Sequence, residues 1–410
     1  MSSDWMSAAE AAAELGISRA TLYAYVSRGM IRSHPEDDGT RTRRYDAADV
    51  RKLKERQDVR RDPGKVAETA LDWGAPLRES ALTLIEGGRL YYRGRDAVTL
   101  ARDLTVEQTA AMLWVGREEE AERLFAYPPA AIGSTCQRLL AELGNSAAIE
   151  RLQAALPLLA MEDLEAFDLR PGQVAMTGAR LLKRMALLAT GEIERMDSAS
   201  IAESLAQAWR PDLSSAASLL SAALILCADH ELNVSSFTAR CVASAGSSPY
   251  AVVSGGLAAL LGVKHGGNTG RVEALLQECG APENARATLA GRVRRGDGVP
   301  GFGHPLYPDG DPRGRMLLDI TASACPNSSG LRLANALAEQ GRSILHHEPN
   351  LDFGLCTIRA ALDLPPGSAL TLFALGRTIG WIAHAIEEYQ ADTLIRPRAR
   401  YTGGRPEEHG

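Results

Sequence analysis

The stretch GDGVPGFGHPLYPDGDPRGR, residues 296–315, constrains the fold most, because its glycines and prolines predict a loop system. The glycines between residues 298 and 303 let the backbone approach a ligand closely, since glycine tolerates positive φ. His304 follows at once, and Arg313 stands nine residues later in an expected Asp-Pro-Arg turn. An imidazole and a guanidinium from one loop system can polarise a carbonyl and pair with a carboxylate. We therefore expect an anionic carbonyl substrate, with an ordinary surface loop as the alternative.

The rest of the chain favours helices. Alanine and leucine runs recur, aromatic residues make up only 5% of the sequence, and strands are enriched in aromatic and β-branched residues. A Gly-Gly turn and a short extended Leu-Tyr-Tyr piece precede helical patterns that continue to about Ala228, and we expect Pro157, Pro171 and Pro211 to separate these helices. With 410 residues and 45% hydrophobic content, the chain is long enough for two or three domains of a mainly α protein.

Cysteines, charge and hydropathy narrow the class of protein. The six cysteines form no close pair with metal-site or redox spacing, so we expect reduced, buried thiols and no metal site. The N-terminus lacks the pattern of a signal peptide, and the longest largely apolar run, Leu219 to Ala228, is far short of a membrane span. These features predict a soluble, cytoplasmic protein with no membrane contact. A net charge of −6 argues against a surface that coats nucleic acid, but not against a local basic patch.

The N-terminal 62 residues have the order helix, turn, helix, wing, helix. Ser7 to Glu10 forms a capping box, and Ser18 caps a second helix that runs to about Arg28. A Pro/Asp/Gly turn and an arginine-rich arm follow, and Asp46 starts another helix. This is a DNA-binding order. Residues 5 to 56 resemble the winged helix-turn-helix of MerR and excisionase-type proteins.

That resemblance makes residues 18–28 the recognition helix, with Arg19, Thr21 and Tyr23 toward DNA. It also implies that three wing residues meet phosphates, namely Arg41, Arg43 and Arg44. Residues 1–62 carry 12 Lys/Arg against 11 Asp/Glu, a net charge of +1, which is weak for a DNA-binding domain. A structural or protein-contact role for these residues therefore stays open beside DNA binding. Residues 63–76 follow as a linker.

His304 and three further residues have side chains suited to chemistry. His230 ends an apolar run, where it could simply cap carbonyls, and His265 stands beside glycines after the small-residue helix VVSGGLAALLG. His304 is the third histidine, and Asp352 lies in an expected apolar loop, PNLDFG. A buried carboxylate is costly unless it is paired or used. Three arginines stand nearby or later in the chain, namely Arg313, Arg377 and Arg396. Together with the histidines and Asp352, they suit carbon–carbon bond formation between an acyl thioester and an oxo-acid.

From about residue 77 to residue 403, the chain resembles citrate synthase in the residues of several motifs and in their order. In chain order these are GGRLYYRGRD, ADHELN, VKHGGN, PGFGHPLYPDGDPR, PNLDF, GRTIGWIAH and IRPRARYTG. The resemblance implies a two-domain helical fold. A large domain would comprise residues 77–265 and 366–410, and a small domain, residues 266–365, would close over the cleft.

Roles for single residues also follow from the resemblance. It makes Asp352 the base that removes a methyl proton from acetyl-CoA, His265 the neutral donor to the thioester oxygen, and His304 the group that polarises the oxaloacetate carbonyl. Four residues would hold the substrate carboxylates, the last from the other subunit of a homodimer: His230, Arg313, Arg377 and Arg396. The segment that borders the CoA adenine would be Val299, Pro300, Gly301, Phe302 and Gly303. No metal or cofactor is implied, since the coenzyme A thioester is a substrate.

Some positions depart from the family's usual residues. Cys227 stands where many members have histidine, and Pro305 and Pro308 replace more basic residues. Gly354 and Leu355 replace more polar residues, and the segment of residues 191–219 is shorter than in other family members. These departures leave the choice of acyl-CoA open. We expect citrate formation from acetyl-CoA and oxaloacetate, with 2-methylcitrate synthesis from propionyl-CoA as the alternative. A third possibility is a DNA-binding regulator whose synthase-like body senses CoA esters or oxo-acids.

Overall fold

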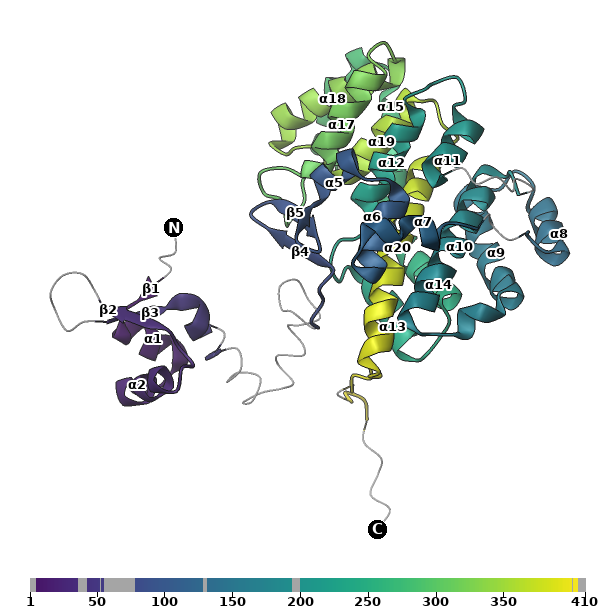
Figure 1. Ribbon diagram of the computed structural model, residues 1–410. Helices are drawn as coiled ribbons and strands as arrows, with labels where there is room; N and C mark the ends of the chain where they lie inside the picture. Colours follow the sequence, from purple (N-terminus) through teal and green to yellow (C-terminus); the bar gives the residue numbers. More distant parts are fainter. Residues whose placement is uncertain are drawn as a thin grey trace. The chain divides into compact units, whose positions relative to one another are not determined.

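The computed structural model describes residues 5–35, 43–51, 53–54, 78–127, 131–193, 200–399 and 401–404. The chain divides into two compact units, Met1–Glu79 and Ser80–Gly410, each of which is described on its own (Figure 1). Arg41 and the tip of the expected wing lie outside the described residues.

The N-terminal unit combines two short helices with a three-stranded antiparallel sheet of strand order β1-β3-β2. Its elements are β1 (Trp5–Met6), α1 (Ala8–Leu15), α2 (Arg19–Ser27), β2 (Ser33–Pro35) and β3 (Arg43–Asp46). In the register of the sheet, β3 pairs with both neighbours, so that Tyr45 lies opposite Met6 on one side and Ser33 on the other. A further helical segment starts at residue 47, directly after Asp46.

Local hydrogen bonds explain where these two helices begin. Ser7 Oγ accepts from the Glu10 N–H, and Glu10 Oε2 accepts from the Ser7 N–H, which confirms the predicted capping box. Ser18 Oγ accepts from the Thr21 N–H at the start of α2, also as predicted. The apolar faces of both helices meet the sheet in a small core of Ala11, Ala12, Leu15, Leu22, Ile31, Tyr45, Val50 and Leu53.

The second unit starts with a small antiparallel sheet of β4 (Thr83–Glu86), β5 (Arg89–Tyr92) and β6 (Arg95–Asp96). Gly87 and Gly88, with φ of 59° and 72°, form the two-residue turn between β4 and β5, where both positions need positive φ. The expected turn and extended piece are therefore confirmed. Tyr92 is fully buried, and its hydroxyl donates to the Ile225 carbonyl at 3.1 Å, which joins the sheet to the helices.

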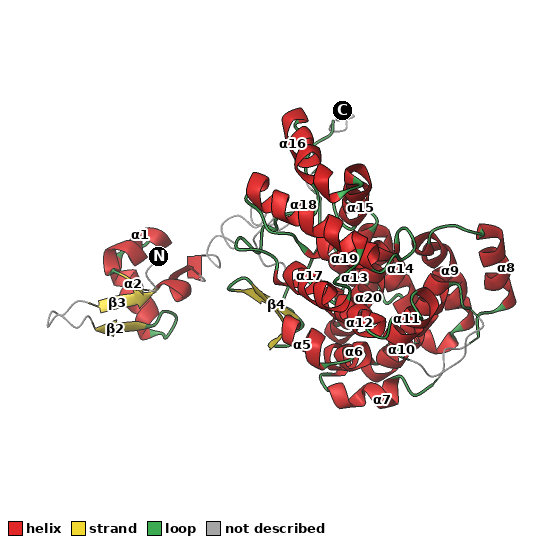
Figure 2. Ribbon diagram, turned by 90° about the horizontal axis from the view of Figure 1, so that it is seen from above, coloured by secondary structure: helices red, strands yellow, loops and turns green. Residues whose placement is uncertain are grey.

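The rest of this unit is helical, as predicted. Its α-helices are α5 (Ala97–Asp103), α6 (Val106–Val115), α7 (Ala121–Leu124), α8 (Ser134–Leu143), α9 (Ala148–Glu162), α10 (Pro171–Thr190), α11 (Ile201–Trp209), α12 (Ala216–Cys227), α13 (Val234–Ser244), α14 (Pro249–Leu260), α15 (Gly267–Cys279), α16 (Ala285–Arg295), α17 (Pro312–Ala324), α18 (Ser329–Leu345), α19 (Leu351–Ala361) and α20 (Ser368–Ala391). Short 3₁₀ turns are η1 (Glu118–Glu120), η2 (Leu164–Phe167) and η3 (Pro282–Asn284). Both views show α15, α17, α18 and α19 gathered together, away from α8 and α9 (Figures 1 and 2).

Helix α20 is the centre of this unit, because α6, α9, α10, α12, α13, α14, α15 and α19 all pack against it. Among the described residues it is the one helix long and apolar enough to cross a membrane, although the sequence drew attention only to a shorter run. Its most apolar window is 94% buried within the protein, which is the behaviour of a core helix. Gly376 lets it approach α12 closely, since a Cβ there would overlap the Leu224 carbonyl oxygen.

Three local expectations were wrong. Pro157 does not separate two helices but lies inside α9, where burial of one helix face, including Leu152 and Leu156, outweighs the lost backbone hydrogen bond. Asp352 lies in the first turn of α19 rather than in a loop, because Asn350 caps that helix by accepting from the Phe353 N–H. Arg313 likewise stands in the first turn of α17, which the Asp311 side chain caps.

Candidate active site

Two of the predicted histidines meet at the edge of the 296–315 loop system. The rings of His230 and His304 lie 5.1 Å apart between centroids in an edge-on arrangement. Tyr307 packs against both rings, and its hydroxyl is 3.0 Å from His230 Nε2. His230 reaches this point from the turn after α12, so the loop brings together side chains that are 74 residues apart in sequence.

The protonation state of His304 follows from its hydrogen bond. Its Nδ1 lies 3.2 Å from the Leu306 backbone nitrogen, which can only donate, so Nδ1 is the acceptor and Nε2 carries the proton. Burial, with a smaller contribution from the charge of Arg313, lowers the pKa of His304 to about 4. The ring is therefore neutral at pH 7 and presents one N–H donor.

Arg313 is held rigidly by its own helix cap. Its Nε and Nη2 donate to the two carboxylate oxygens of Asp311 at 2.9 and 2.8 Å, and both side chains are buried. The guanidinium also lies 5.2 Å from the centroid of the Tyr307 ring. Burial alone would raise the pKa of Asp311, but the charge and hydrogen bonds of Arg313 outweigh this effect and lower it. One edge of Arg313 is therefore already occupied before any substrate binds.

Arg377 is the second buried arginine of the site. It projects from α20, its Nε donates to the Cys227 carbonyl at 2.8 Å, and its guanidinium lies 5.0 Å from the centre of the Phe373 ring. Its Nη1 is buried and has no hydrogen-bond partner among the described residues. Burial lowers the pKa of Arg377, although a guanidinium still remains charged at neutral pH. An unpaired, buried, charged donor of this kind is suited to an anionic ligand.

Asp352 is held by neutral donors. Thr269 Oγ1 donates to Oδ1 at 2.5 Å, and Asn268 Nδ2 donates to Oδ2 at 2.8 Å. Burial raises the pKa of Asp352, and the two hydrogen bonds offset part of that rise. A carboxylate with a raised pKa and a fixed orientation is a stronger base than a solvated one.

His265 precedes these two donors in the chain, between α14 and α15. Its Nε2 lies 2.9 Å from Ser235 Oγ, which accepts from Trp381 Nε1 at 3.2 Å and donates to Asn233 Oδ1 at 2.8 Å. Burial lowers the pKa of His265 to about 4, with a smaller contribution from Arg377. His265 is therefore neutral at pH 7, like His304.

Backbone pairing brings the glycine-rich loop to the start of α19. Gly303 N–H donates to the Glu348 carbonyl at 2.8 Å, and Asn350 N–H donates to the Gly301 carbonyl at 2.9 Å. Gly301 has φ of 87°, and a Cβ there would press against Phe353. The loop expected at the CoA adenine, residues 299–303, is therefore hydrogen-bonded to Asn350, which is two residues before Asp352. This contact brings the loop close to Asp352 although the two are far apart in sequence.

Among the remaining predicted residues, Arg396 does not join this cluster in the single chain. It is exposed in the segment after α20, and its hydrogen bond in the described structure goes to the carbonyl of its neighbour, Pro397. In the N-terminal unit, Arg19, Tyr23 and Arg43 are exposed, whereas Thr21 and Arg44 are partly buried.

The sequence analysis missed the groups that hold the candidate catalytic residues. They are Ser235, Asn268, Thr269, Tyr307 and Asp311. Each stands within five residues of a predicted site residue, so proximity to the motifs was the available signal. Chain proximity alone does not say which residue such a side chain contacts. Of the described residues, no group of three His, Cys, Asp or Glu side chains is placed to hold a metal ion.

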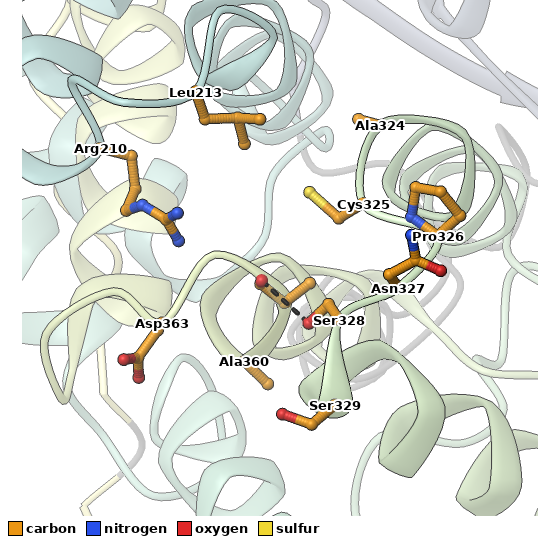
Figure 3. A pocket seen from close by; sticks show the side chains of 11 residues that line it. Arg210, Leu213, Ala324, Cys325, Pro326, Asn327, Ser328, Ser329, Ala360 and Asp363 are labelled. Carbon is orange, nitrogen blue, oxygen red and sulfur yellow. Dashed lines mark hydrogen bonds between the residues drawn. The ribbon is translucent and has the colours of Figure 1, made fainter.

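A pocket of about 550 Å³ lies elsewhere in this unit (Figure 3). It is lined by the end of α11, the turn between α17 and α18, and the end of α19, including Arg210, Cys325, Ser328 and Asp363. Arg210 pairs there with Asp212 and donates to the Leu362 carbonyl. None of the histidines or carboxylates described above lines this pocket, so it is separate from their cluster.

Comparison with known families decides what this cluster belongs to. Residues 71–398 match the family described as citrate synthase, C-terminal domain. This chain belongs to the citrate synthase family. It is therefore a citrate synthase-type enzyme, a transferase, and enzymes of this family need no cofactor because the CoA thioester is a substrate. Residues 5–58 match a helix-turn-helix domain, which confirms the second predicted resemblance.

Individual relatives agree with this assignment. Citrate synthase 2 of Bacillus subtilis is 29% identical over 352 residues, which cover 80% of this chain and 94% of that protein. The citrate synthase of Mycolicibacterium smegmatis is 30% identical, with coverage of 78% and 90%. A 2-methylcitrate synthase of Mycobacterium tuberculosis is also 30% identical, with coverage of 77% and 84%. Overall identity therefore does not separate the two substrate classes.

Solved structures show the same fold. Citrate synthase from Thermotoga maritima is 28% identical, with a TM-score of 0.69 over 82% of this chain and 96% of that one. The citrate synthase from Thermoplasma acidophilum, solved with carboxymethyl coenzyme A and oxaloacetate, has a TM-score of 0.73 at 24% identity, with coverage of 84% and 98%. The predicted mainly α, citrate synthase-like fold is thus confirmed.

Proposed function

We propose that the enzyme condenses acetyl-CoA with oxaloacetate to give citrate and CoA, as a citrate synthase in the tricarboxylic acid cycle. The observation that carries the proposal is the Asp352 carboxylate, which is partly buried and held by two neutral donors, and whose segment is hydrogen-bonded to the loop of His304. A regulator that only senses its ligands needs no such base. Propionyl-CoA as the acyl donor, giving 2-methylcitrate, is the second candidate, favoured by the related 2-methylcitrate synthase.

The first step that we propose is proton removal from the acyl-CoA. Asp352 takes the α-proton, while His265 donates a hydrogen bond to the thioester oxygen and stabilises the enol. His265 can donate from Nδ1 once the Ser235 hydroxyl turns its proton from Asn233 Oδ1, 2.8 Å away, to His265 Nε2, 2.9 Å away. A thioester α-proton is weakly acidic, so this step needs both groups fixed in a site that excludes water.

The second step is attack of the enol carbon on the oxaloacetate carbonyl carbon. His304, neutral and protonated on Nε2, would polarise the carbonyl and give its proton to the oxygen as the carbon–carbon bond forms. His230, Arg313 and Arg377 would hold the substrate carboxylates, and the buried, unpaired Nη1 of Arg377 supports this role. Hydrolysis of the thioester by water then releases CoA and the tricarboxylate.

Release of free CoA tests the proposal directly. The full-length protein is mixed with oxaloacetate and either acetyl-CoA or propionyl-CoA, and the new thiol is followed with a thiol reagent. We expect turnover that depends on oxaloacetate, and the ratio of the two kcat/KM values assigns the acyl group. No thiol release with either ester, together with tight binding of oxaloacetate, would instead support the sensor.

We also propose a homodimer in which Arg396 completes the neighbour's site. Arg396 is exposed in the single chain. Three large apolar side chains of one segment, Met161, Leu164 and Phe167, are also exposed, and such a patch suits burial against a second copy. Within each chain, a large and a small domain would close over the bound substrates. The large domain would comprise residues 77–265 and 366–410, and the small domain residues 266–365. Mixing inactive Arg396→Ala and Asp352→Asn chains should restore activity, because one hybrid site carries both native residues. No recovery after verified subunit exchange would contradict the shared site.

For the N-terminal unit we propose DNA binding, with Arg19, Thr21 and Tyr23 of α2 toward the bases. Arg43 and Arg44 on β3, and Arg41, would contact phosphates. The exposed side chains of Arg19, Tyr23 and Arg43 support this reading. Reversing the charge of the three wing arginines should weaken binding to all sequences and flatten its salt dependence, because phosphate contacts release counterions. A full-length chain that fails to shift its own upstream DNA at low salt would indicate a protein-contact role.

A further inference from the structure

The residue directly before His230 is a buried carboxylate held from two distant parts of the chain. Asp229 is fully buried. Thr83 Oγ1, on strand β4, donates to its Oδ2 at 2.6 Å, and His384 Nε2, on helix α20, lies 3.1 Å from its Oδ1. The Asp229 backbone N–H also donates to the Tyr92 hydroxyl at 3.3 Å. Asp229 thus fixes the end of α12 to both the sheet and the central helix.

The orientation of His384 is determined by Arg240. Arg240 Nε can only donate, and it lies 2.9 Å from His384 Nδ1, so that nitrogen is the acceptor. His384 is therefore a neutral ring whose Nε2–H points to Asp229. Arg240 is in turn fixed by ion pairs with Glu387 and Glu388, and all of its partners lie on α20. This network leaves His384 one orientation.

The same helix also supports the substrate side of the site. Arg377 precedes His384 by seven residues, about two helical turns, so both project from one face of α20. Between them, Gly380 allows close contact, since a Cβ there would overlap the Ala228 carbonyl oxygen and lie 2.6 Å from Asp229 Oδ1. Any shift of Asp229 relative to α20 would therefore move His230 relative to Arg377.

The turn that carries His230 has a conformation that needs support. Glu231, the next residue, has φ of 52°, in the left-handed region that side chains other than glycine rarely adopt. Such strain persists when neighbouring contacts hold it, and the side chain of Asp229 supplies contacts on the other side of His230. The hydrogen bonds of the Asp229 side chain go to Thr83 and His384, with a longer one from Ser236 Oγ at 3.5 Å.

From these contacts, and resting on the proposed function, we propose that Thr83 and His384 are positioning residues for the oxo-acid. By holding the Asp229 carboxylate, they fix the turn that places His230 at the correct distance from Arg377. They act on the substrate that His230 and Arg377 bind, and not on the acyl-CoA. Loss of either hydrogen bond therefore weakens use of oxaloacetate selectively.

Thr83→Val tests this most cleanly, because valine has the shape of threonine without the hydroxyl. We expect the oxaloacetate KM to rise about 10-fold, the scale on which small misplacements of substrate-binding groups act, while the acyl-CoA KM stays within about 2-fold. Thr83→Ser, which keeps the hydroxyl, should restore the oxaloacetate KM. The oxaloacetate Kd, measured by calorimetry without acyl-CoA, should follow the same order.

His384 gives an independent pair of variants. His384→Gln can accept from Arg240 and donate to Asp229, whereas His384→Leu can do neither, so glutamine should retain a lower oxaloacetate KM than leucine. Thermal melts show whether each variant is folded, and the Thr83 pair decides the matter if His384→Leu is not. An unchanged oxaloacetate KM in folded Thr83→Val, or an equal rise in both substrates' KM values, would overturn the proposal. A wild-type chain that neither binds nor consumes oxaloacetate would overturn the proposed function itself.

Discussion

Asp311, which is buried, and Asp352, which is partly buried, are carboxylates at adjacent helix starts whose pKa values move in opposite directions. Asp311 caps α17, and its Oδ2 accepts from the Leu351 N–H at 3.1 Å, directly beside Asp352 in the first turn of α19. Asp311 pairs with the charged Arg313, which lowers its pKa. Asp352 accepts only from Thr269 and Asn268 among the described residues, and burial raises its pKa.

The difference shows how partner charge separates structure from chemistry. A cationic partner stabilises the anion so strongly that Asp311 remains charged and serves as a rigid support. Neutral donors fix the orientation of Asp352 but leave it basic enough to accept a proton. Asp311 is the more deeply buried of the two and still has the lowered pKa, so the charge of the partner outweighs burial here.

A substitution at Asp352 should have the largest effect on turnover. Asp352→Asn keeps the shape and the neighbours but removes the base, so kcat should fall by roughly 10²–10⁴-fold. Because asparagine is neutral in this partly buried site, the thermal stability should change little. CoA release and a thermal melt on the same preparation measure both effects. Near-normal turnover would remove Asp352 from the mechanism.

Asp311→Asn should show the reverse balance, with stability affected first. It leaves the buried Arg313 without its carboxylate, and breaking a buried pair costs about 3–5 kcal/mol in the free energy of unfolding. Glu278→Gln is the matched control, because Glu278 is exposed and its partner Arg292 is still 21% exposed, and pairs in contact with water contribute at most about 1 kcal/mol. Equal losses in the two variants, measured by denaturant titration, would contradict the supporting role of Asp311.

The pH dependence of stability gives a second measurement on Asp311. Its pKa is lower in the folded than in the unfolded chain, so the stability that it contributes is present above the unfolded pKa and is lost as the pH falls. Asp311→Asn should therefore flatten the loss of stability below about pH 4 relative to the wild type. A full acid dependence in the variant would place that titration elsewhere.

Removal of one neutral donor to Asp352 should have a smaller effect, a shift in the pH profile of kcat. Thr269→Val removes a hydrogen bond to the charged form of Asp352, so its pKa should rise and the acid limb of the kcat profile should move up by about one pH unit. Thr269→Ser, which keeps the hydroxyl, should leave the profile in place. A profile that does not move in Thr269→Val would mean that this hydrogen bond does not tune the base.

Much of this protein was predictable from the sequence, because the signals are local. The helix caps at Ser7 and Ser18 depend on partners three residues away, and the chain order of the motifs indicated the family and its fold. The histidines, Asp352 and the buried arginines stand in those motifs, so the sequence also indicated the candidate site. It failed for Pro157 and for the secondary structure around Asp352, where packing and a cap determined the helix.

Only the tertiary structure decided which groups hold the site residues. The hydrogen bonds from Asn268 to Asp352, and from His384 to Asp229, join residues 84 and 155 positions apart. Such partners depend on how helices pack, and no periodicity or spacing in the sequence encodes them. The proton positions on His304 and His384 depend on a backbone or arginine donor placed by the fold. The sequence thus determined which chemical groups are present, whereas the fold set their charge, orientation and basicity, because these depend on burial and on neighbours distant in the chain.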